Sequence, residues 1–173
     1  INEAILNGAQ LIICNNDFNS LEVVVIKVDD TKKILLSLGE LIRNKYLEIP
    51  VIAVTGSVGK TTTKELIYRI LSSKYKVLKN EGNKNNKIGL SETLFQLSSD
   101  YDICVVEMGM NHLGEISDLS KCAKPNIGII TNIGTSHIGY LGSKKNIYKA
   151  KKEILDGIDN GVILINGDDN YLK

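Results

Sequence analysis

The sequence predicts an α/β fold in which a mostly parallel sheet is flanked by helices. Three observations support this prediction. Short, strongly apolar segments alternate with amphipathic ones along the 173 residues, and strands this apolar are typical of parallel sheets covered on both faces. Residues 51–63 join a buried strand to a glycine-containing turn and the start of a helix. Polar residues follow several strand ends, at the edge where open parallel sheets bind ligands.

The composition indicates a folded protein without a strong overall charge. Hydrophobic residues make up 43% of the chain, which is enough for a packed core, and 21 basic against 20 acidic residues give a net charge of +1. This balance gives no reason to expect binding to nucleic acid or to an anionic membrane. No segment has the length of a membrane span or the layout of a signal peptide.

The cysteines and the chain ends predict a cytoplasmic protein that is longer than this segment. Cys14, Cys104 and Cys122 are far apart and lie in apolar surroundings, so we expect them to be reduced core residues. The chain begins without Met, inside an apparent helix at 3–7, and stops shortly after a strand. We therefore expect further residues on both sides.

Residues 1–49 contain two short strands and one long helix, as judged from their apolar patterns. Strands are expected at 11–14 and 23–28, and a helix at 31–45 with Asp30 or Thr31 as its cap. Pro50 then ends this block and marks a predicted domain boundary. The spacing within the long helix predicts one apolar face, made of Ile34, Leu35, Leu38, Leu41 and Ile42.

The remaining residues repeat the alternation of strand and helix. Strands are expected at 51–55, 77–78, 103–107, 127–130 and 162–166. Helices are expected at 61–73, 89–97, 115–124 and 146–157, and a long glycine-rich loop at 131–143. The helix at 61–73 is expected to turn Leu66, Ile67, Ile70 and Leu71 toward the sheet.

The turn after strand 51–55 has the layout of a phosphate-binding loop. Its pattern is Gly56-x-x-Gly59-Lys60-Thr61, shorter than the usual G-x-x-x-x-G-K-[ST] because Val54 stands at the first position of the longer form. In this geometry backbone N–H groups and the positive end of a helix dipole converge on an anion. Lys60 can then reach the terminal phosphates and the Thr61 hydroxyl can hold Mg²⁺. We predict that the chain binds a nucleoside triphosphate.

Other strand ends carry polar residues, and each of them has two interpretations. Glu107 suits a Mg²⁺ ligand but could be a solvated acid. The asparagine-rich segment 81–86 could bind a ligand through its amides or form a surface turn. Segment 111–115 could contribute to a site or cap a helix. His137 follows a strand on the same edge, although a lone histidine is more often structural.

Taken together, several segments resemble the Mur ligases of peptidoglycan synthesis. The resemblance is strong from about Pro50 to the end; before it, only a general apolar run ending in Val-Asp-Asp-Thr fits. It is closest to the members that add D-alanyl-D-alanine to UDP-N-acetylmuramoyl-tripeptide, because of the patterns Glu-Gly-Asn-x-Asn-Asn-x-Ile-Gly and Asn-His-x-Gly-Glu-Ile. The matching segments are 55–64, 81–89, 106–116, 123–137, 141–143, 150–154 and 166–169.

This resemblance implies a protein of three domains, of which the chain would hold only part. Residues 1–49 would be the C-terminal part of a small α/β N-terminal domain that binds the UDP-sugar. Residues 50–173 would be the first part of a central P-loop-type ATPase domain. The rest of the central domain and a C-terminal Rossmann-like domain would lie outside the chain, so we expect this segment alone to be inactive.

The resemblance also assigns residues to the nucleotide and to a first Mg²⁺. Lys60 would bind the β- and γ-phosphates, Thr61 would bind the first Mg²⁺, and Glu107 would serve the metal sites. Asn166 would contact adenine, although its segment alone could be only a turn. The residues assigned to nucleotide binding in the phosphate loop are Gly56, Ser57, Gly59, Lys60, Thr61 and Thr62.

A second Mg²⁺ site is implied at His137 and Lys151. By sequence alone, Lys151 belongs to a solvated basic helix face shared with Lys144, Lys145, Lys149 and Lys152. The resemblance instead implies that Lys151 can react with CO₂ to form a carbamate, which is an anionic oxygen ligand. The implied catalytic residues are therefore Lys60, His137 and Lys151.

The implied reaction is the formation of an amide bond driven by ATP. A substrate carboxylate would attack the γ-phosphate to give an acyl phosphate while Lys60 and the metal ions neutralise charge, and the amine of D-alanyl-D-alanine would then displace phosphate. The implied ligands are ATP, two Mg²⁺ ions and the two peptide substrates, with no nucleic acid, no membrane span and a monomeric protein. Asn83, Asn86 and Asn111 would contact substrate or phosphate.

Three other interpretations remain open from the sequence. A P-loop module could bind nucleotide as a switch without ligation, and it would then need neither His137 nor Lys151. A related amide ligase (another Mur ligase, or a folylpolyglutamate or cyanophycin synthetase) would share most segments, but the asparagine-rich loop disfavours it. A small-molecule kinase would share the phosphate loop but would not explain segments 131–137 and 150–154.

Overall fold

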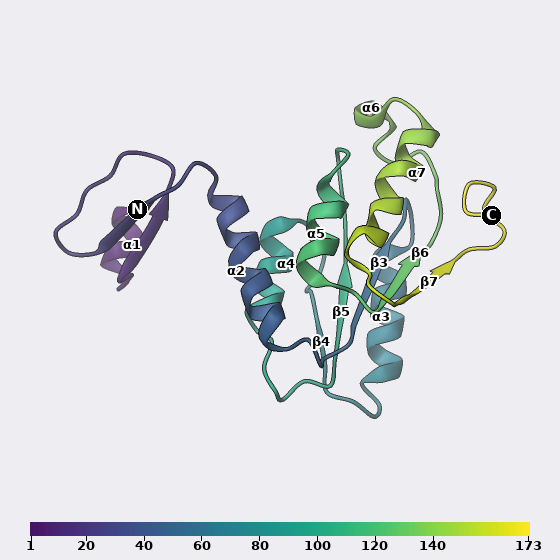
Figure 1. The fold of residues 1–173 in the computed structure, drawn as a ribbon, viewed down its shortest axis with the longest axis horizontal. Helices are drawn as coiled ribbons and strands as arrows, with labels where there is room; N and C mark the ends of the chain where they lie inside the picture. Colours follow the sequence, from purple (N-terminus) through teal and green to yellow (C-terminus); the bar gives the residue numbers. More distant parts are fainter.

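The computed structural model describes residues 1–173, and five short apolar segments in it pair to form a sheet (Figure 1). In spatial order these are β4 (Val77–Lys79), β5 (Ile103–Glu107), β3 (Val51–Thr55), β6 (Ile127–Ile130) and β7 (Val162–Ile165). Every pairing is parallel, which confirms the predicted sheet. The carboxyl ends of the strands therefore meet at one edge, the upper one in Figure 1.

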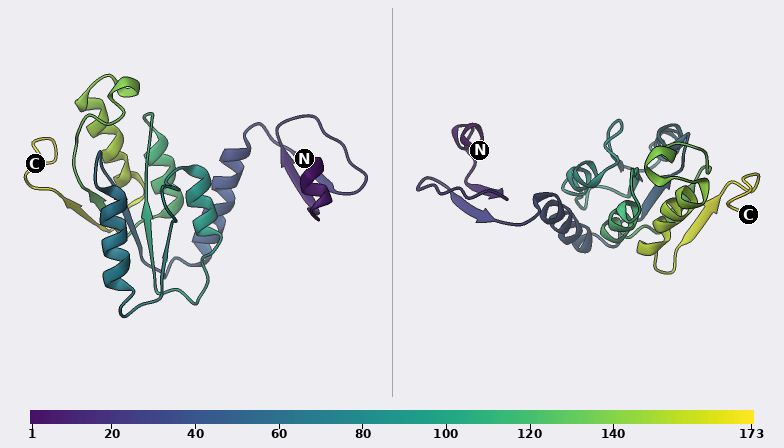
Figure 2. Two further views of the ribbon diagram at one scale, coloured as in Figure 1. Left: turned by 180° about the vertical axis from the view of Figure 1, so that it is seen from behind. Right: turned by 90° about the horizontal axis from the view of Figure 1, so that it is seen from above.

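Helices cover both faces of this sheet. α3 (Lys60–Leu71) lies on one face and stands in front when the molecule is seen from behind (Figure 2). α5 (Glu115–Ala123) and α7 (Lys144–Lys152) cover the other face, where η1 (Glu153–Gly157) continues α7 as a 3₁₀ helix. α4 (Lys87–Leu94) packs against α5. The main apolar core lies on this second side, because most of its helical members come from α4, α5, α7 and η1.

The loop expected at 131–143 contains one short helix that the sequence did not predict. This helix, α6 (Ile138–Leu141), is a single turn, so its residues cannot show a helical periodicity. The other differences concern boundaries: α4 begins and ends earlier than the predicted 89–97, and the helix predicted at 146–157 is divided between α7 and η1.

Residues before Asp30 form a small unit beside the main body. α1 (Asn2–Leu6) precedes β1 (Leu11–Cys14) and β2 (Val24–Lys27), and these two strands pair in parallel. Figures 1 and 2 show this unit standing apart from the five-stranded sheet, with α2 (Thr31–Lys45) connecting the two.

Helix α2 packs on the main body. Asp30 caps its start, as predicted, since the Asp30 carboxylate accepts a hydrogen bond from the Lys32 N–H at 2.9 Å. The helix lies against α4 and α5. The contact is close at Gly39, where a Cβ would stand 3.3 Å from the Cα of Ser91 on α4. The division of the chain at Pro50 stays a prediction.

The apolar face predicted for α2 is wrong in part. Leu38 and Leu41 are 39% and 59% exposed. Leu36 packs against the core instead, and Gly39 and Arg43 are the buried positions of the helix. The prediction failed because it used only the spacing of apolar side chains. Such a pattern does not place a glycine or an arginine in the core, even where contacts with other segments bury them.

Arg43 is 1% exposed, and its guanidinium group binds backbone carbonyls at the ends of α5 and of its own helix. Its Nε donates to the carbonyl of Ala123 at 2.7 Å, and its terminal nitrogens donate to the carbonyls of Tyr46 and Lys124. Replacing Arg43 with methionine would leave buried acceptors unpaired, and we expect the free energy of unfolding to fall by about 2–4 kcal/mol. Urea unfolding of the Arg43→Met protein measures this, with the exposed Lys45→Met as its matched control. Equal midpoints for the two variants would contradict the role of Arg43.

The inner face predicted for α3 also needs correction. Ile67 and Leu71 are partly buried, as expected, but Leu66 and Ile70 are 55% and 70% exposed. The fully buried side chain of this helix is Lys64. Its position shows that the side of α3 facing the sheet is set by polar contacts as well as by apolar ones.

The three cysteines lie in the core, as the sequence predicted. Cys14, Cys104 and Cys122 are buried and form no disulfide. Burial raises the pKa of the Cys104 and Cys122 thiols to about 12, so both stay protonated. None of the helices combines the length and the apolar character that crossing a membrane requires.

Candidate functional site

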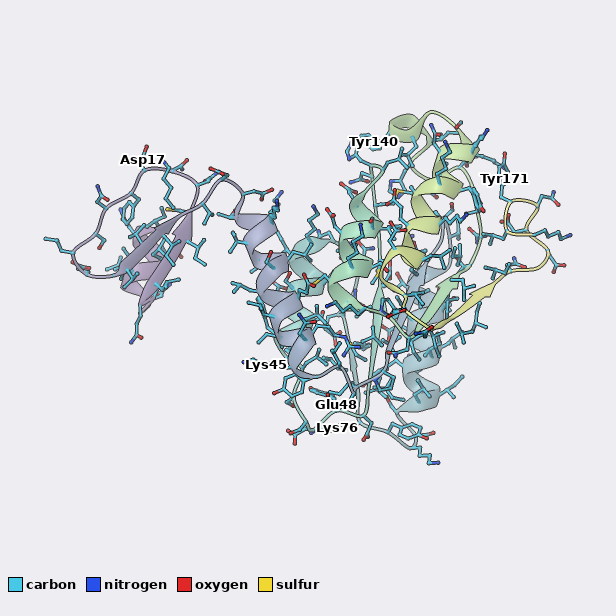
Figure 3. The ribbon with its side chains drawn as sticks, viewed as in Figure 1. Asp17, Lys45, Glu48, Lys76, Tyr140 and Tyr171 are labelled. Atoms are coloured by element: carbon cyan, nitrogen blue, oxygen red, sulfur yellow. The ribbon has the colours of Figure 1, made fainter.

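The polar residues singled out from the sequence converge on the edge where the strands end. The loops after β3, β4, β5 and β6 all lie there, since these strands are parallel. Figure 3 shows Tyr140 of α6 at this edge and Lys76 at the opposite one. The local geometry of each loop decides which side chains meet.

The loop after β3 has the backbone that a phosphate-binding turn requires. Gly56 and Gly59 have φ angles of +147° and +83°, a region that residues with a Cβ rarely adopt. A Cβ on Gly56 would in addition overlap the hydroxyl of Thr131. Gly59 is the N-cap of α3 and Lys60 its first residue. The positive end of the α3 dipole therefore opens on the turn, as predicted.

The loop after β6 holds this turn from the other side. Asn132 accepts the Ser57 N–H at its carbonyl and the Val58 N–H at its side-chain Oδ1, both at 3.0 Å. The Thr131 hydroxyl donates to the Val58 carbonyl at 2.6 Å, and the Ser57 hydroxyl accepts the Gly134 N–H at 2.8 Å. The turn is thus held by both side-chain and backbone groups of the loop after β6.

Glu107 ends β5 with its carboxylate buried between neutral donors. It is 2% exposed. Its Oε2 accepts the Thr61 hydroxyl at 2.7 Å, and its Oε1 accepts the Asn85 amide at 2.7 Å. The structure therefore brings Thr61 and Glu107 together, as predicted. Asn85 was not among the predicted site residues, although it lies in the predicted asparagine-rich segment.

A second asparagine anchors the loop that carries Asn85. Asn80 is fully buried after β4, and its side chain accepts the Glu107 N–H at 2.9 Å and donates to the carbonyls of Lys84 and Glu107. Lys64, on α3, donates to the carbonyls of Asn80 and Gly82 at 2.6 and 3.0 Å. The loop after β4 is therefore attached to both the sheet and α3.

Lys151 lies buried against the phosphate loop rather than on the solvated face of α7. It is 2% exposed, and its Nζ donates to the carbonyl of Gly56 at 2.9 Å. Burial, and then the positive charge of Lys60, lower the pKa of Lys151 to about 7. The other lysines of α7 are exposed, as the sequence predicted.

His137 shares this electrostatic environment. It is the N-cap of α6 and has a left-handed φ of +66°, which is uncommon for non-glycine residues. Partial burial, and then the charges of Lys151 and Lys60, lower the pKa of His137. The lowered pKa favours the neutral imidazole, which is the form that binds metal ions.

Two carboxylates fix the loop between β5 and α5. Glu115 accepts the Asn111 and His112 N–H groups at 2.6 and 3.2 Å; burial opposes its ionisation, but these hydrogen bonds hold the pKa of the Glu115 carboxyl below its ordinary value. Glu153, on η1, accepts the Gly114 N–H at 2.8 Å. This loop is thereby attached to the segment that carries Lys151.

These loops surround a cavity of about 290 Å³. Its walls carry three lysines, on α2, α3 and α4, against the single carboxylate of Glu115, so the cavity suits an anionic ligand. Predicted residues that line it are Lys60, Asn86, Asn111 and His137, and residues not predicted are Lys32, Asn85, Lys87, Ile88, Gly109, Met110, Glu115 and Leu119.

Some predicted residues lie elsewhere or are used differently. Asn83 is exposed and does not line the cavity. Asn166 is exposed after β7, where its side chain accepts the Asp168 N–H at 3.0 Å. Asn86 accepts the Gly89 N–H with its side chain and so caps α4. Thr62 is exposed on the first turn of α3.

Comparison with known proteins places this arrangement in one family. The family model described as "Mur ligase middle domain" matches residues 54–173. UDP-N-acetylmuramoyl-tripeptide--D-alanyl-D-alanine ligases from Synechocystis and Bacillus subtilis are each 45% identical, over 90% and 86% of the chain. The chain covers 34% and 33% of these relatives, so it spans about a third of their length.

Solved structures give the same result. A crystal structure of MurF from Acinetobacter baumannii matches 99% of the chain with a TM-score of 0.93 and 37% identity, and the chain covers 38% of it. MurF from Thermotoga maritima, in complex with ADP, matches 97% with a TM-score of 0.88 and 32% identity, and the chain covers 39% of it. FolC from Escherichia coli, at 16% identity and a TM-score of 0.57, shares the fold alone.

Proposed function

The chain belongs to the Mur ligase family, and on this premise we propose that it is the nucleotide-binding part of an ATP-dependent ligase joining D-alanyl-D-alanine to UDP-N-acetylmuramoyl-tripeptide. Residues 1–49 would close the UDP-sugar-binding domain, and residues 50–173 would begin the ATP-binding domain. The observation that supports this most is the meeting of Lys60, Thr61, Glu107 and Lys151 around one phosphate loop.

The phosphate loop fits the β- and γ-phosphates of ATP. Gly59 caps the N-terminus of α3, and Lys60, the first residue of that helix, lines the cavity. Backbone N–H groups at a helix start and a lysine together bind phosphate oxygens. Ser57 and Gly56 shape this loop by their bonds to neighbouring segments, so their role is to keep the N–H groups in place.

Thr61 and Glu107 fit a first Mg²⁺ ion. They supply a hydroxyl and a carboxylate, which are the hard oxygen ligands this ion prefers, and the hydrogen-bond partners of the buried carboxylate are neutral. No group of three or more His, Cys, Asp or Glu side chains is placed to hold a metal. Phosphate oxygens and water would complete the coordination, as is usual for Mg²⁺. The ion, when bound, neutralises charge on the transferring phosphoryl group.

Lys151 and His137 would serve a second Mg²⁺. An amine with a pKa of about 7 is unprotonated in about half of the molecules at neutral pH, and only that form adds to CO₂. Burial thus prepares Lys151 for conversion to a carbamate, whose oxygens suit a cation as the ammonium does not. Partial burial, and then the charges of Lys151 and Lys60, lower the pKa of His137 and favour its neutral form.

In the proposed reaction, this chain orients and neutralises groups but forms no covalent bond with the substrate. A carboxylate of the tripeptide takes the γ-phosphoryl group, ADP leaves, and Lys60 balances the charge on the phosphate oxygens. The amine of D-alanyl-D-alanine then attacks the acyl carbon, and phosphate and a proton leave. Asn86 and Asn111 line the cavity that would receive the substrate; Asn83 and Asn166 stay proposed for substrate and for adenine.

The test is a measurement of ADP release in the complete reading frame that contains this chain. ATP and UDP-N-acetylmuramoyl-tripeptide would be supplied with and without D-alanyl-D-alanine. We expect sustained release only when both peptide substrates are present. Release that is indifferent to the dipeptide would reject this ligase and favour a related one. Nucleotide binding without release under any condition would favour a switch.

A further inference from the structure

Asn85 is held on three sides at the floor of the cavity. Its side-chain Nδ2 donates to Glu107 Oε1 at 2.7 Å. Its carbonyl accepts the Gly109 N–H at 2.8 Å, and its own N–H donates to the Asn83 carbonyl at 2.7 Å. A Cβ on Gly109 would stand 2.6 Å from Asn85 Oδ1, so the amide group lies directly over this glycine. The side chain therefore has little freedom to leave Glu107.

The bond from Asn85 fixes the orientation of the Glu107 carboxylate, so that one of its oxygens faces Thr61. A carboxylate can rotate about its last bond, and two donors placed on different oxygens remove that rotation. Asn85 holds Oε1, so Oε2 is left to Thr61, whose hydroxyl donates to it at 2.7 Å. Once that hydroxyl has donated its hydrogen, its lone pairs remain available to a cation.

The amide does this without cancelling the charge of Glu107. A lysine or arginine in the place of Asn85 would also hold Oε1, but its positive charge would oppose the approach of a divalent ion. A carboxylate would repel Glu107 and accept where a donor is needed. An amide is therefore the side chain that orients the carboxylate and leaves its negative charge in place.

We propose that Asn85 is the positioning residue of the first Mg²⁺ site, acting through Glu107. This rests on the proposed metal site at Thr61 and Glu107, but not on which peptides are joined. Groups that orient a metal ligand in this way typically change metal affinity tenfold or more when they are removed.

The experiment measures ADP binding by calorimetry at increasing Mg²⁺ concentrations, and again in EDTA, with the complete reading frame. Asn85→Leu keeps the approximate size of the side chain but removes the amide; Asn85→Ala removes it without adding bulk. We expect both variants to raise the Mg²⁺ concentration for half-maximal enhancement of ADP binding by about tenfold. ADP affinity in EDTA should stay unchanged. The exposed Lys84→Ala, in the same loop, should behave as wild type.

The outcomes separate this proposal from the function proposed above. If wild-type ADP binding does not respond to Mg²⁺, the metal site itself is wrong, and Asn85 has nothing to position. If Mg²⁺ enhances ADP binding at the same concentration in wild type and in both Asn85 variants, the metal site stands and only the role of Asn85 is overturned. A loss of ADP affinity that is as large in EDTA as with Mg²⁺ would also overturn it, since Asn85 would then shape the nucleotide pocket. Thermal unfolding shows whether each variant folds. If Asn85→Leu does not fold, the Mg²⁺ dependence of Asn85→Ala alone tests the proposal.

Discussion

Replacing Lys60 with alanine is expected to lower the rate of ligation by about a hundredfold to a thousandfold. Lys60 begins α3 and lines the cavity, and it belongs to none of the ion pairs of the chain. Its charge is therefore free to act on phosphate oxygens. The interaction of this charge with the phosphate oxygens is expected to be stronger in the transition state than with bound ATP. Its loss should therefore lower kcat more than it raises KM for ATP.

The control for Lys60 is Arg69→Ala, which removes an exposed positive charge from the last turn of the same helix. It should leave the rate unchanged. Lys60→Arg keeps the charge but changes its shape, so we expect a partial loss only. A Lys60→Ala protein with the rate of wild type would contradict the assignment of this loop to phosphate.

Replacing Lys151 with alanine is expected to lower ligation by about a hundredfold or more, because this change removes the ligand proposed for the second metal ion. The matched control is Lys149→Ala, on the same helix but exposed. Wild-type activity should also fall when CO₂ is removed from the buffer and return when bicarbonate is added. Carbon-13 bicarbonate should give a carbamate signal in wild type that Lys151→Ala lacks. Full activity in CO₂-free buffer would refute the carbamate.

The stability of the metal-free protein gives a second measure of Lys151. Its pKa is about 7 in the folded chain, lowered by burial and then by Lys60, against an ordinary value of 10.5. Between these two pH values the unfolded state binds more protons, so the free energy of unfolding rises with pH. Below about pH 7 the buried amine is charged in the folded protein too, and the free energy of unfolding no longer changes with pH on its account. Denaturant unfolding from about pH 7 to pH 10 should show this rise in wild type and a smaller one in Lys151→Met.

The strand-end residues could be predicted because topology alone brings them together. Once 51–55, 103–107 and 127–130 are parallel strands, the residues that follow them must share one edge. This was enough to predict that Thr61, Glu107 and His137 lie at the same edge, where the structure shows Thr61 bonded to Glu107 and His137 affected by the Lys60 charge. It needed no knowledge of side-chain packing.

The residues that the sequence did not reveal are those whose role depends on a single close contact. Lys64 is buried because two carbonyls of the next loop accept its hydrogen bonds, and no periodicity signals that. Which asparagine of segment 81–86 reaches Glu107 depends on the loop path over Gly109. Gly109, two residues after the carboxylate, was the one available sign that something lies close to the backbone there.

Helix α2 decides where the chain can be divided into pieces that fold. A shortened chain beginning at Pro50 would lose the guanidinium of Arg43 and leave the carbonyls of Ala123 and Lys124 unpaired. It would also expose to water the side of α4 that packs on Gly39. A chain beginning at Asp30 would keep the helix, its cap and these contacts. The five-stranded body therefore depends on α2 for its packing, and the shortest piece that keeps these contacts starts at the residue that caps this helix.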